Sequence, residues 1–378
     1  IIGTPIAQGS SSVMKKGAMV NSHFIKSIFQ RIQSKEGRIR INLIGKRAWW
    51  MARSVISGDV SYKADEVSIP LSVARTLQIQ EVFQEYNFDK LMIYFRNGRN
   101  QYPGCTRIKR KNGGLYLIDM VKKDFYPEIG DTIYRDIITG DYACFNRAPA
   151  LMISSIGAHK VVVMRDESIQ TFQMNVMACP WYHADFDGDQ MLLWVPRSLL
   201  ARVEAKYISS VHNWFIMTSN ATPAIGEEQD AVVGSFEITR ESVKMDRQHA
   251  LRIVGASHMK YNLDSDKKDF TGKEVVSELL SEFPISYEGK PGYYKESFAP
   301  YIRYTEQEKH IKISKGKLTQ GVVDGSSISG GSVNGIFHLI SQRYGTKVAI
   351  DMLYAYQQLV LKFMDNHGFT IAMSDMTP

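Results

Sequence analysis

The chain has 378 residues, of which 44% are hydrophobic and 22% are charged, an ordinary composition for a globular protein. No apolar run approaches the roughly 20 residues that a membrane-spanning helix needs, which excludes an integral membrane protein, and no signal peptide is visible. The net charge of +7 fits a nucleic-acid partner, although many basic proteins bind none.

The N-terminal region is polar and basic. Residues 9–12 are Gly-Ser-Ser-Ser and predict a loop or flexible connection. The first residue is Ile rather than Met, so we expect the segment to be processed or to lack its true start. Over residues 38–43 polar and apolar side chains alternate, and this period of two predicts a strand with one polar face. Residues 35–53 contain one acidic residue, Glu36, and six basic residues: Lys35, Arg38, Arg40, Lys46, Arg47 and Arg53.

Residues 60–195 have the pattern of a β-rich domain. Short apolar runs at residues 115–121 and 161–164 are separated by turn signals at residues 102–104, 112–114 and 139–141. Many short strands punctuated in this way predict a barrel or a sandwich.

Three cysteines lie in this region: Cys105, Cys144 and Cys179. They form no CxxC pair, which argues against a zinc ribbon and a disulfide framework and suits a reducing compartment. The sequence therefore predicts three buried, inert thiols.

Helical patterns follow the β-rich region. Residues 198–207 predict a helix with Ser198 as its N-cap. Residues 241–378 predict a mixed but mainly helical region, in which apolar residues have helical spacing on both sides of Gly345. No internal repeat is found, and the whole pattern predicts a mixed α+β fold.

The most informative segment is residues 183–191, His-Ala-Asp-Phe-Asp-Gly-Asp-Gln-Met. In an extended segment Asp185, Asp187 and Asp189 lie on one side, about 7 Å apart for neighbours, and a turn at Gly188 can draw them closer. Two such charges about 5 Å apart repel by roughly 3 kcal/mol at an effective dielectric of about 20. The cluster therefore takes up protons or binds a hard cation, and all-oxygen ligation favours magnesium or manganese over zinc.

Two other interpretations of this segment are possible. A solvated acidic turn is disfavoured because Phe186 and residues 191–195 make its flanks apolar. A calcium-binding EF-hand needs Gly at position six and Glu at position twelve. Counted from Asp185, those positions hold Gln190 and Pro196, so this interpretation is poor.

Residues 183–189 resemble the metal-binding motif Asn-Ala-Asp-Phe-Asp-Gly-Asp of the largest subunit (β′ in bacteria) of multisubunit DNA-dependent RNA polymerases. Residues 35–56 resemble the strand and switch region of that family, which grips template DNA, and residues 65–70 and 102–104 fit its next landmarks. Residues 145–149, Phe-Asn-Arg-Ala-Pro, resemble Phe-Asn-Arg-Gln-Pro, and His159 lies in a segment like Met-Ala-His. Residues 223–230, 335–340 and 367–371 resemble pore-domain elements, so the resemblance covers residues 25–378 in the order of the family.

The resemblance implies a double-psi β-barrel active-site domain followed by a mainly helical pore or funnel domain. The implied division is a clamp-base or switch segment with a basic strand over residues 1–45 and the catalytic barrel over residues 46–213. A pore-like domain, incomplete at its C-terminus, would cover residues 214–378.

The resemblance also implies nucleotidyl transfer from nucleoside triphosphates to the 3′ end of RNA on a DNA template. Asp185, Asp187 and Asp189 would be the catalytic residues that hold one magnesium ion, and a second ion would arrive with the triphosphate. Arg147, Pro149 and His183 would contact the substrate. Arg147 would bond the ribose hydroxyls, its alternative role being a salt bridge within the barrel, and for His183 a packing role is the alternative.

The basic N-terminal residues would contact nucleic-acid phosphates, which position the strand without reading its sequence. These residues are Arg38, Arg40, Lys46, Arg47 and Arg53. For any single one of them a solvated surface charge is nearly as good an interpretation. Trp49 and Trp50 can stack on bases, but buried packing is the favoured prediction.

As partners, the resemblance implies a β-like subunit with the second barrel and the remainder of the β′-like subunit with the bridge helix and trigger loop. Template DNA, the RNA transcript and nucleoside triphosphates would complete the complex, with no membrane. The expected location is the cytoplasm, that of an infected host for a viral or phage protein, with packaging in virions as an option. The alternatives are a two-barrel RNA-dependent RNA polymerase and a non-catalytic nucleic-acid-binding assembly subunit.

The sequence departs from the family at three places. His183 replaces the Asn of the metal motif, which leaves the selection of ribose over deoxyribose open. Ala148 replaces a Gln, and residues 48–51 are Ala-Trp-Trp-Met where the family has Val-Asp-Phe/Tyr-Ser. Such drift indicates a divergent viral or giant-phage member, either a largest subunit split between genes or a fragment.

Overall fold

The computed structural model describes residues 28–33, 35–46, 49–121, 125–264, 266–294 and 307–373. The chain divides into two units, Ile1–Met51 and Ala52–Pro378. In the first unit the described residues form two short helices, α1 (Ile28–Gln33) and η1 (Ile39–Ile44), of which η1 is of the π type.

The prediction of a strand over residues 38–43 is wrong, because this segment is helical. Ile41 donates its backbone N–H to the carbonyl of Gly37, and the Arg38 side chain donates to Asn42 four residues on, at 3.0 Å. The side chains of η1 are all exposed, and among the described residues no strand pairs with it. Alternating residues give a strand only where a neighbouring strand accepts the backbone hydrogen bonds; a helix satisfies those bonds internally.

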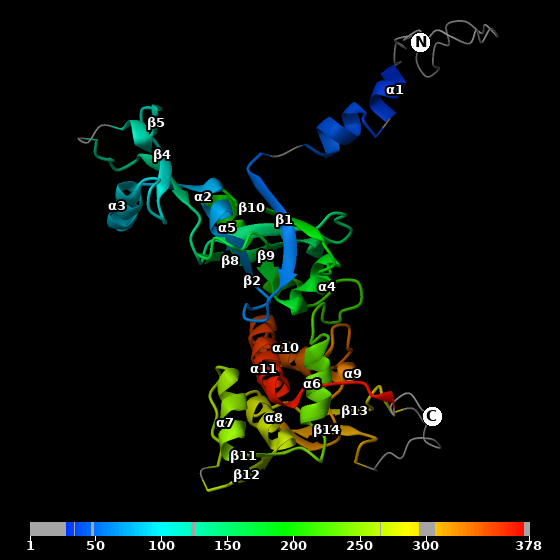
Figure 1. Cartoon of the computed structure of the whole chain (residues 1–378). Helices are drawn as coiled ribbons and strands as arrows, with labels where there is room; N and C mark the ends of the chain where they lie inside the picture. Colours follow the sequence, from blue (N-terminus) through cyan, green and yellow to red (C-terminus); the bar gives the residue numbers. More distant parts are fainter. Residues whose placement is uncertain are drawn as a thin grey trace, which may run out of the picture. The chain divides into compact units, whose positions relative to one another are not determined.

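The second unit contains a closed six-stranded barrel with the strand order β1-β10-β7-β8-β2-β9 (Figure 1). The strands β1–β9 and β2–β8 pair in parallel, whereas β7–β8, β7–β10 and β2–β9 pair antiparallel. The strand bounds are β1 (Met51–Gly58), β2 (Glu66–Pro70), β7 (Tyr142–Asn146), β8 (Ile156–Met164), β9 (Phe172–Met174) and β10 (Gln190–Trp194). The prediction of a barrel among the β-rich residues is thereby confirmed.

Apolar side chains from all sides fill the barrel. The ring of Phe145 on β7 meets those of Phe172 on β9 and Tyr182 edge-on, with centroids 5.7 and 5.8 Å apart. Such edge-to-face pairs stabilise a core beyond the burial of their area. Aliphatic and sulfur-containing side chains of the barrel strands are buried as well: Ile56, Val67, Ile69, Val161, Met174, Met191 and Leu193.

A separate sheet is inserted between β2 and β7. Its strands have the order β3-β6-β4-β5, and helix α3 (Phe88–Asn97) packs against β4 and β6. A small core of its own includes Phe83, Leu91, Ile108 and Ile133. Besides α3, the elements between β2 and β7 are α2 (Leu71–Thr76), β3 (Gln78–Val82), η2 (Glu85–Asn87), β4 (Cys105–Lys109), β5 (Leu115–Leu117), η3 (Ile118–Met120) and β6 (Thr132–Asp136).

Helix α5 (Leu199–Tyr207) leads out of the barrel, and Ser198 caps it as predicted by accepting the backbone N–H of Ala201 at 3.2 Å. Beyond it, the long helix α11 (Thr346–His367) packs against α6, α7 and α10 (Figure 1). Gly345, with φ of 94°, separates α10 from α11, which confirms helical spacing on both sides of this residue. The other helices are α6 (Asp230–Ile238), α7 (Arg247–Ala256), α8 (Gly272–Leu280), α9 (Gly325–Ile328) and α10 (Ile336–Tyr344).

Five short strands accompany these helices, so the C-terminal half is mixed as predicted. They form one two-stranded and one three-stranded sheet. Their bounds are β11 (Lys244–Asp246), β12 (Asp269–Thr271), β13 (Tyr287–Gly289), β14 (Ile311–Ser314) and β15 (Lys317–Gln320).

Helix α11 also contacts the barrel side of the second unit. Asn175, which follows β9, donates to Gln357 at 2.8 Å, and both side chains are buried. Tyr354 donates to the carbonyl of Ser61, and Lys63 pairs with Asp351 at 2.9 Å. These contacts fix α11 to the loop between β1 and β2 and to the segment after β9.

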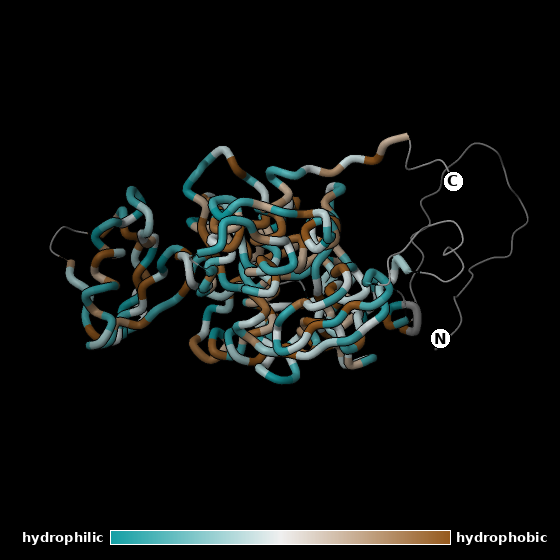
Figure 2. The backbone as a smooth tube through the Cα atoms, turned by 90° about the horizontal axis from the view of Figure 1, so that it is seen from below, coloured by the Kyte–Doolittle hydropathy of each residue, from teal (hydrophilic) through white to brown (hydrophobic). Residues whose placement is uncertain are grey.

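Hydrophilic and hydrophobic residues are interspersed along the described chain (Figure 2). Among the described residues, no helix is both long and apolar enough to cross a membrane.

Candidate metal centre

The acidic segment is the loop between α4 (Cys179–Tyr182) and β10. Helix α4 ends because His183 adopts the left-handed conformation, with φ of 49°. Gly188 has φ of 117°, a conformation in which glycine is favoured because it has no Cβ atom. The loop therefore turns back on itself immediately before the barrel strand begins.

Phe186 anchors this loop to the barrel. Its ring lies so close to Gly58 on β1 that a Cβ atom at position 58 would come within 2.8 Å of the ring atom Cε2. Phe186 is half-buried and packs against the main core, whereas its neighbours Asp185 and Asp187 are exposed. The packing of one aromatic side chain thus leaves the carboxylates on either side of it free of the core.

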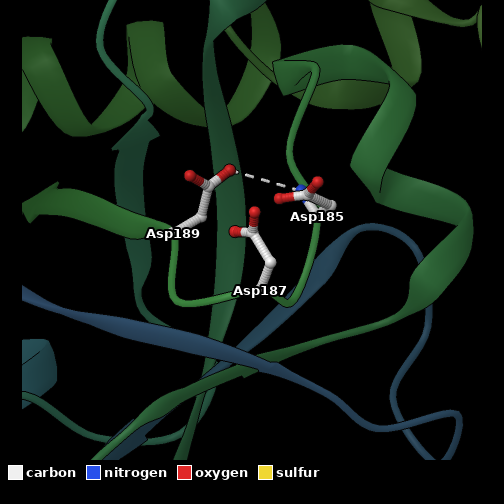
Figure 3. Close-up of side chains that lie close together, drawn as sticks. All are labelled: Asp185, Asp187 and Asp189. Atoms are coloured by element: carbon white, nitrogen blue, oxygen red, sulfur yellow. Dashed lines mark hydrogen bonds between the residues drawn. The ribbon is translucent and has the colours of Figure 1, made fainter.

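The three carboxylates converge (Figure 3). One ligand oxygen from each of Asp185, Asp187 and Asp189 lies within 4.8 Å of the others. The backbone N–H of Asp185 donates to Oδ2 of Asp189 at 3.3 Å and closes the loop, as the dashed line in Figure 3 shows. The turn at Gly188 therefore brings the oxygens closer together than the roughly 7 Å of an extended segment.

Arg147, directly after β7, neutralises part of this charge. Its Nε donates to Oδ2 of Asp189 at 2.6 Å and its Nη2 donates to Oδ1 at 3.2 Å. The hydrogen bond from Arg147 holds the pKa of Asp189 below its usual value. In contrast, a hydrogen bond with Asp187 and the negative charges nearby raise the pKa of Asp185. The cluster thus contains one paired carboxylate and two that repel each other.

The donor set of this cluster fits a divalent hard cation. All its ligand atoms are carboxylate oxygens, which magnesium and manganese prefer. The two exposed carboxylates leave room for the waters or phosphate oxygens that complete an octahedral shell. A cation would also relieve the repulsion that raises the pKa of Asp185.

The other predicted substrate contacts lie on neighbouring elements. Pro149 is exposed and follows Arg147 in the loop after β7. His183 is exposed on the acidic loop, and its Nε2 lies 3.2 Å from Sδ of Met152. This contact ties the loop after β7 to the loop before β10, so both predicted contacts border the same region of the barrel as the carboxylates.

The basic candidates divide between the units. Arg38, Arg40 and Lys46 are exposed in the first unit, and Arg53 is exposed on β1 in the second. Arg47 lies outside the described residues.

The prediction that Trp49 and Trp50 are buried is wrong. Their side chains are 87% and 45% exposed. An aromatic pair within a basic stretch is apolar enough to enter a core, but the local pattern does not show whether a core lies beside it.

Sequence reasoning did not identify the buried layer beneath the loop. Nε2 of His159 on β8 lies 2.5 Å from the hydroxyl of Tyr182 on α4, and both side chains are buried. Burial lowers the pKa of His159 to about 4, so this imidazole is neutral at physiological pH. A Cβ atom at Gly157 would come within 2.6 Å of the same hydroxyl, so this glycine is required for the close approach.

The three cysteines are free and buried, as predicted. Burial raises the pKa of the Cys105 and Cys179 thiols to about 12 and that of Cys144 to about 11. These thiols are therefore protonated and inert at neutral pH.

Two protein families match consecutive parts of the chain. Residues 45–211 match RNA polymerase Rpb1, domain 2, and residues 214–376 match RNA polymerase Rpb1, domain 3. The first match contains the barrel and the acidic loop, and the second contains the helical region.

Relatives with curated descriptions agree with these matches. The DNA-directed RNA polymerase RPB1 homolog of African swine fever virus is 44% identical over 99% of this chain and 26% of its own length. Subunit 1 of the mimivirus enzyme is 31% identical over 94% of this chain and 23% of its own length. Subunit Rpo1N of Sulfolobus acidocaldarius is 31% identical over 93% of this chain and 41% of its own length. The chain thus spans about a quarter of the length of the viral relatives.

Proposed function

The chain belongs to the largest-subunit family of DNA-directed RNA polymerases, in a divergent form similar to viral members, and we propose that it forms the magnesium-binding catalytic part of such an enzyme. The reaction would transfer nucleotidyl groups from nucleoside triphosphates to the 3′ end of RNA on a DNA template. The observation that carries this proposal is the convergence of Asp185, Asp187 and Asp189, with ligand oxygens within 4.8 Å, on a loop of a closed barrel in a chain of this family.

In this proposal the three aspartates hold one magnesium ion, and a second ion arrives with the triphosphate. Bound magnesium would lower the pKa of the attacking 3′-hydroxyl and offset the charge that develops on the phosphoryl oxygens. The chain itself supplies rigid positioning. Phe186 against Gly58 and the hydrogen bond from Asp185 N–H to Asp189 fix the carboxylates relative to the barrel wall.

Arg147 and His183 are the proposed contacts to the incoming nucleotide, with Pro149 beside them. Arg147 has donors to offer a ribose hydroxyl, and it is held at the rim of the site by the β7–β10 ladder, in which Asn146 pairs with Leu192. His183 is exposed on the same loop as the aspartates and can donate from its imidazole. Both groups would orient the sugar relative to the carboxylates.

Nucleic acid would be held by basic side chains that contact phosphates. The proposed residues are Arg38, Arg40, Lys46, Arg47 and Arg53. Those of them that the structure describes are exposed, as phosphate contacts require.

For the fold, we propose that the barrel is of the double-psi type and that the helical region is a pore or funnel domain. The proposed boundaries are residues 1–45, 46–213 and 214–378. A β-like subunit with a second barrel and the bridge helix and trigger loop of the β′-like subunit would complete the active centre. As a viral enzyme, the complex would act in the cytoplasm of the host cell.

Family membership favours this proposal over a two-barrel RNA-dependent RNA polymerase. The remaining alternative is a non-catalytic assembly subunit, which would not require an intact acidic cluster. The preserved triad and its convergence support catalysis.

Reconstitution of the polymerase with its partner subunits tests the proposal. Asp187→Ala is expected to reduce RNA extension on a DNA template by at least a hundredfold, because the ion would lose a ligand. Asp166→Asn, on the exposed loop after β8, is a matched control that should extend RNA normally. Undiminished RNA synthesis by the Asp187→Ala enzyme would support the alternative of a non-catalytic, nucleic-acid-binding assembly subunit. Extension on RNA but not on DNA templates would support the alternative of an RNA-dependent RNA polymerase.

A further inference from the structure

Arg147 occupies both carboxylate oxygens of Asp189. Its Nε and Nη2 donate in a fork to Oδ2 and Oδ1, at 2.6 and 3.2 Å. Oδ2 also accepts the backbone N–H of Asp185 at 3.3 Å, so Asp189 has three donors. Planar forks of this kind are the strong form of the arginine–carboxylate pair.

Among the described residues, Asp185 and Asp187 form no ion pair with a basic side chain, so Arg147 is the sole cation paired with the cluster there. The position of Arg147 is fixed by the chain, since it directly follows β7, whose pairing with β10 brings it beside the end of the acidic loop. The side chains of Arg147 and Asp189 are 24% and 20% exposed, so the pair is partly shielded from solvent.

We infer that Arg147 is a displaceable counter-ion: it holds Asp189 when no metal is bound and competes with the divalent cation for this carboxylate. This inference rests on the proposed metal site. A cation bound to Asp189 competes with the guanidinium for the charge of this carboxylate, because Arg147 donates to both oxygens and the two positive charges repel, so that the guanidinium gives up at least one of its two hydrogen bonds. The donors released in this way become available to other acceptors at the rim of the site.

A thermodynamic cycle gives the sign of the effect. Removing the guanidinium destabilises the metal-free site, where three carboxylates are left without their counter-ion. The metal-bound site loses less, because its Arg147 has already withdrawn. The variant must therefore bind the cation more tightly than the wild type, by about fivefold for a partly exposed pair.

The opposite role predicts the opposite sign. If Arg147 only oriented Asp189 for the metal, its removal would weaken binding, because the carboxylate would lose its fixed position. The two roles are thus distinguished by affinity rather than by activity.

The test uses the full chain without nucleic acid or nucleotide, and Fe²⁺ as the probe. With added hydrogen peroxide, Fe²⁺ in a carboxylate site is oxidised to Fe³⁺ and reduces the peroxide to hydroxide and a hydroxyl radical, which cleaves the polypeptide nearby; added ascorbate returns Fe³⁺ to Fe²⁺. The Fe²⁺ concentration for half-maximal cleavage at residues 183–189 therefore reports affinity. Arg147→Gln should lower this concentration about fivefold. Arg147→Lys, which keeps the charge but not the fork, should lie between the wild type and Arg147→Gln.

Arg165→Gln is the matched control, since it removes one exposed guanidinium directly after β8. It should leave the half-maximal concentration unchanged. Equal or weaker Fe²⁺ affinity in Arg147→Gln, with cleavage at the loop intact in the wild type, overturns the inference alone. Absence of cleavage at this loop in the wild type overturns the metal site and the inference together.

Discussion

The ring of Phe186 lies against Gly58, so that a Cβ atom at position 58 would come within 2.8 Å of ring atom Cε2. This contact joins the acidic loop to β1, although the two residues are far apart in the sequence. It explains how an exposed set of carboxylates keeps a defined geometry: the residue between them is held by the barrel wall.

Gly58→Ala is therefore expected to displace Phe186 and with it the two flanking carboxylates. RNA extension by the reconstituted enzyme should fall at least tenfold, because metal sites tolerate only small displacements of their ligands. Gly255→Ala on α7 is the control, since a Cβ atom there meets nothing within 4 Å, and it should leave extension unchanged. Normal extension by Gly58→Ala would show that the loop does not depend on this contact.

Glu227 gives a prediction about pH. Its side chain is fully buried, neither carboxyl oxygen has a hydrogen-bond partner among the residues that the structure describes, and burial raises its pKa well above the usual value. Glu227 has a lower pKa in the unfolded chain than in the folded protein, so between these two values the folded protein keeps a proton that the unfolded chain has released. The free energy of unfolding therefore falls as the pH rises towards the pKa of the folded state.

Glu227→Gln removes this dependence. The variant should equal the wild type near pH 4 and exceed it at neutral pH, by up to about 1.4 kcal/mol for each pH unit between the two pKa values. Urea unfolding of both proteins across this range measures the difference, with the exposed Glu282→Gln as control. A difference that stays constant with pH would contradict the assignment of a neutral, buried carboxyl.

Asn175 and Gln357 join the barrel side to α11 through two side-chain hydrogen bonds, of 2.8 and 3.3 Å, in a buried position. Asn175→Ala should lower the free energy of unfolding by about 2–3 kcal/mol, because Gln357 is left buried without its partner. Gln358→Ala removes an exposed hydrogen bond from α11 to the carbonyl of Val60 and should cost less than about 1 kcal/mol. Equal losses in the two variants would show that burial of the pair is not what matters.

His183 stands where the family motif has Asn, and its backbone is left-handed, with φ of 49°. Asn is tolerated in this conformation, so His183→Asn should change the free energy of unfolding by less than about 0.5 kcal/mol. His183→Ala should reduce the preference for ribonucleotides over deoxyribonucleotides by roughly tenfold if one hydrogen bond to the sugar is lost. Competition between the two nucleotides in the extension assay measures this preference, and an unchanged ratio in His183→Ala would assign the side chain to packing against Met152.

The sequence was informative where the signal is local. The hydroxyl of Ser198 caps its own helix, and apolar spacing within single helices indicated the helices on both sides of Gly345, so both predictions are confirmed. The spacing of the three aspartates and the glycine between them also predicted a turn that draws carboxylates together.

The prediction failed where the outcome depends on distant parts of the chain. Residues 38–43 alternate as a strand does, yet no described strand pairs with them and they form a helix. The strands of the inserted sheet β3-β6-β4-β5 have the same kind of local sequence pattern as the barrel strands. The two sets differ only in which strands are hydrogen-bonded to each other. The contacts of Phe186 with Gly58, His159 with Tyr182 and Arg147 with Asp189 likewise join segments whose proximity no local pattern reveals.

The most direct test of the central claim is the position of a bound metal. Crystals of the chain or its complex, soaked in Mn²⁺, should show one anomalous peak about 2.0–2.2 Å from an oxygen of each of Asp185, Asp187 and Asp189. No peak among these three residues at saturating Mn²⁺, or a peak bound by other side chains in its place, would contradict the account.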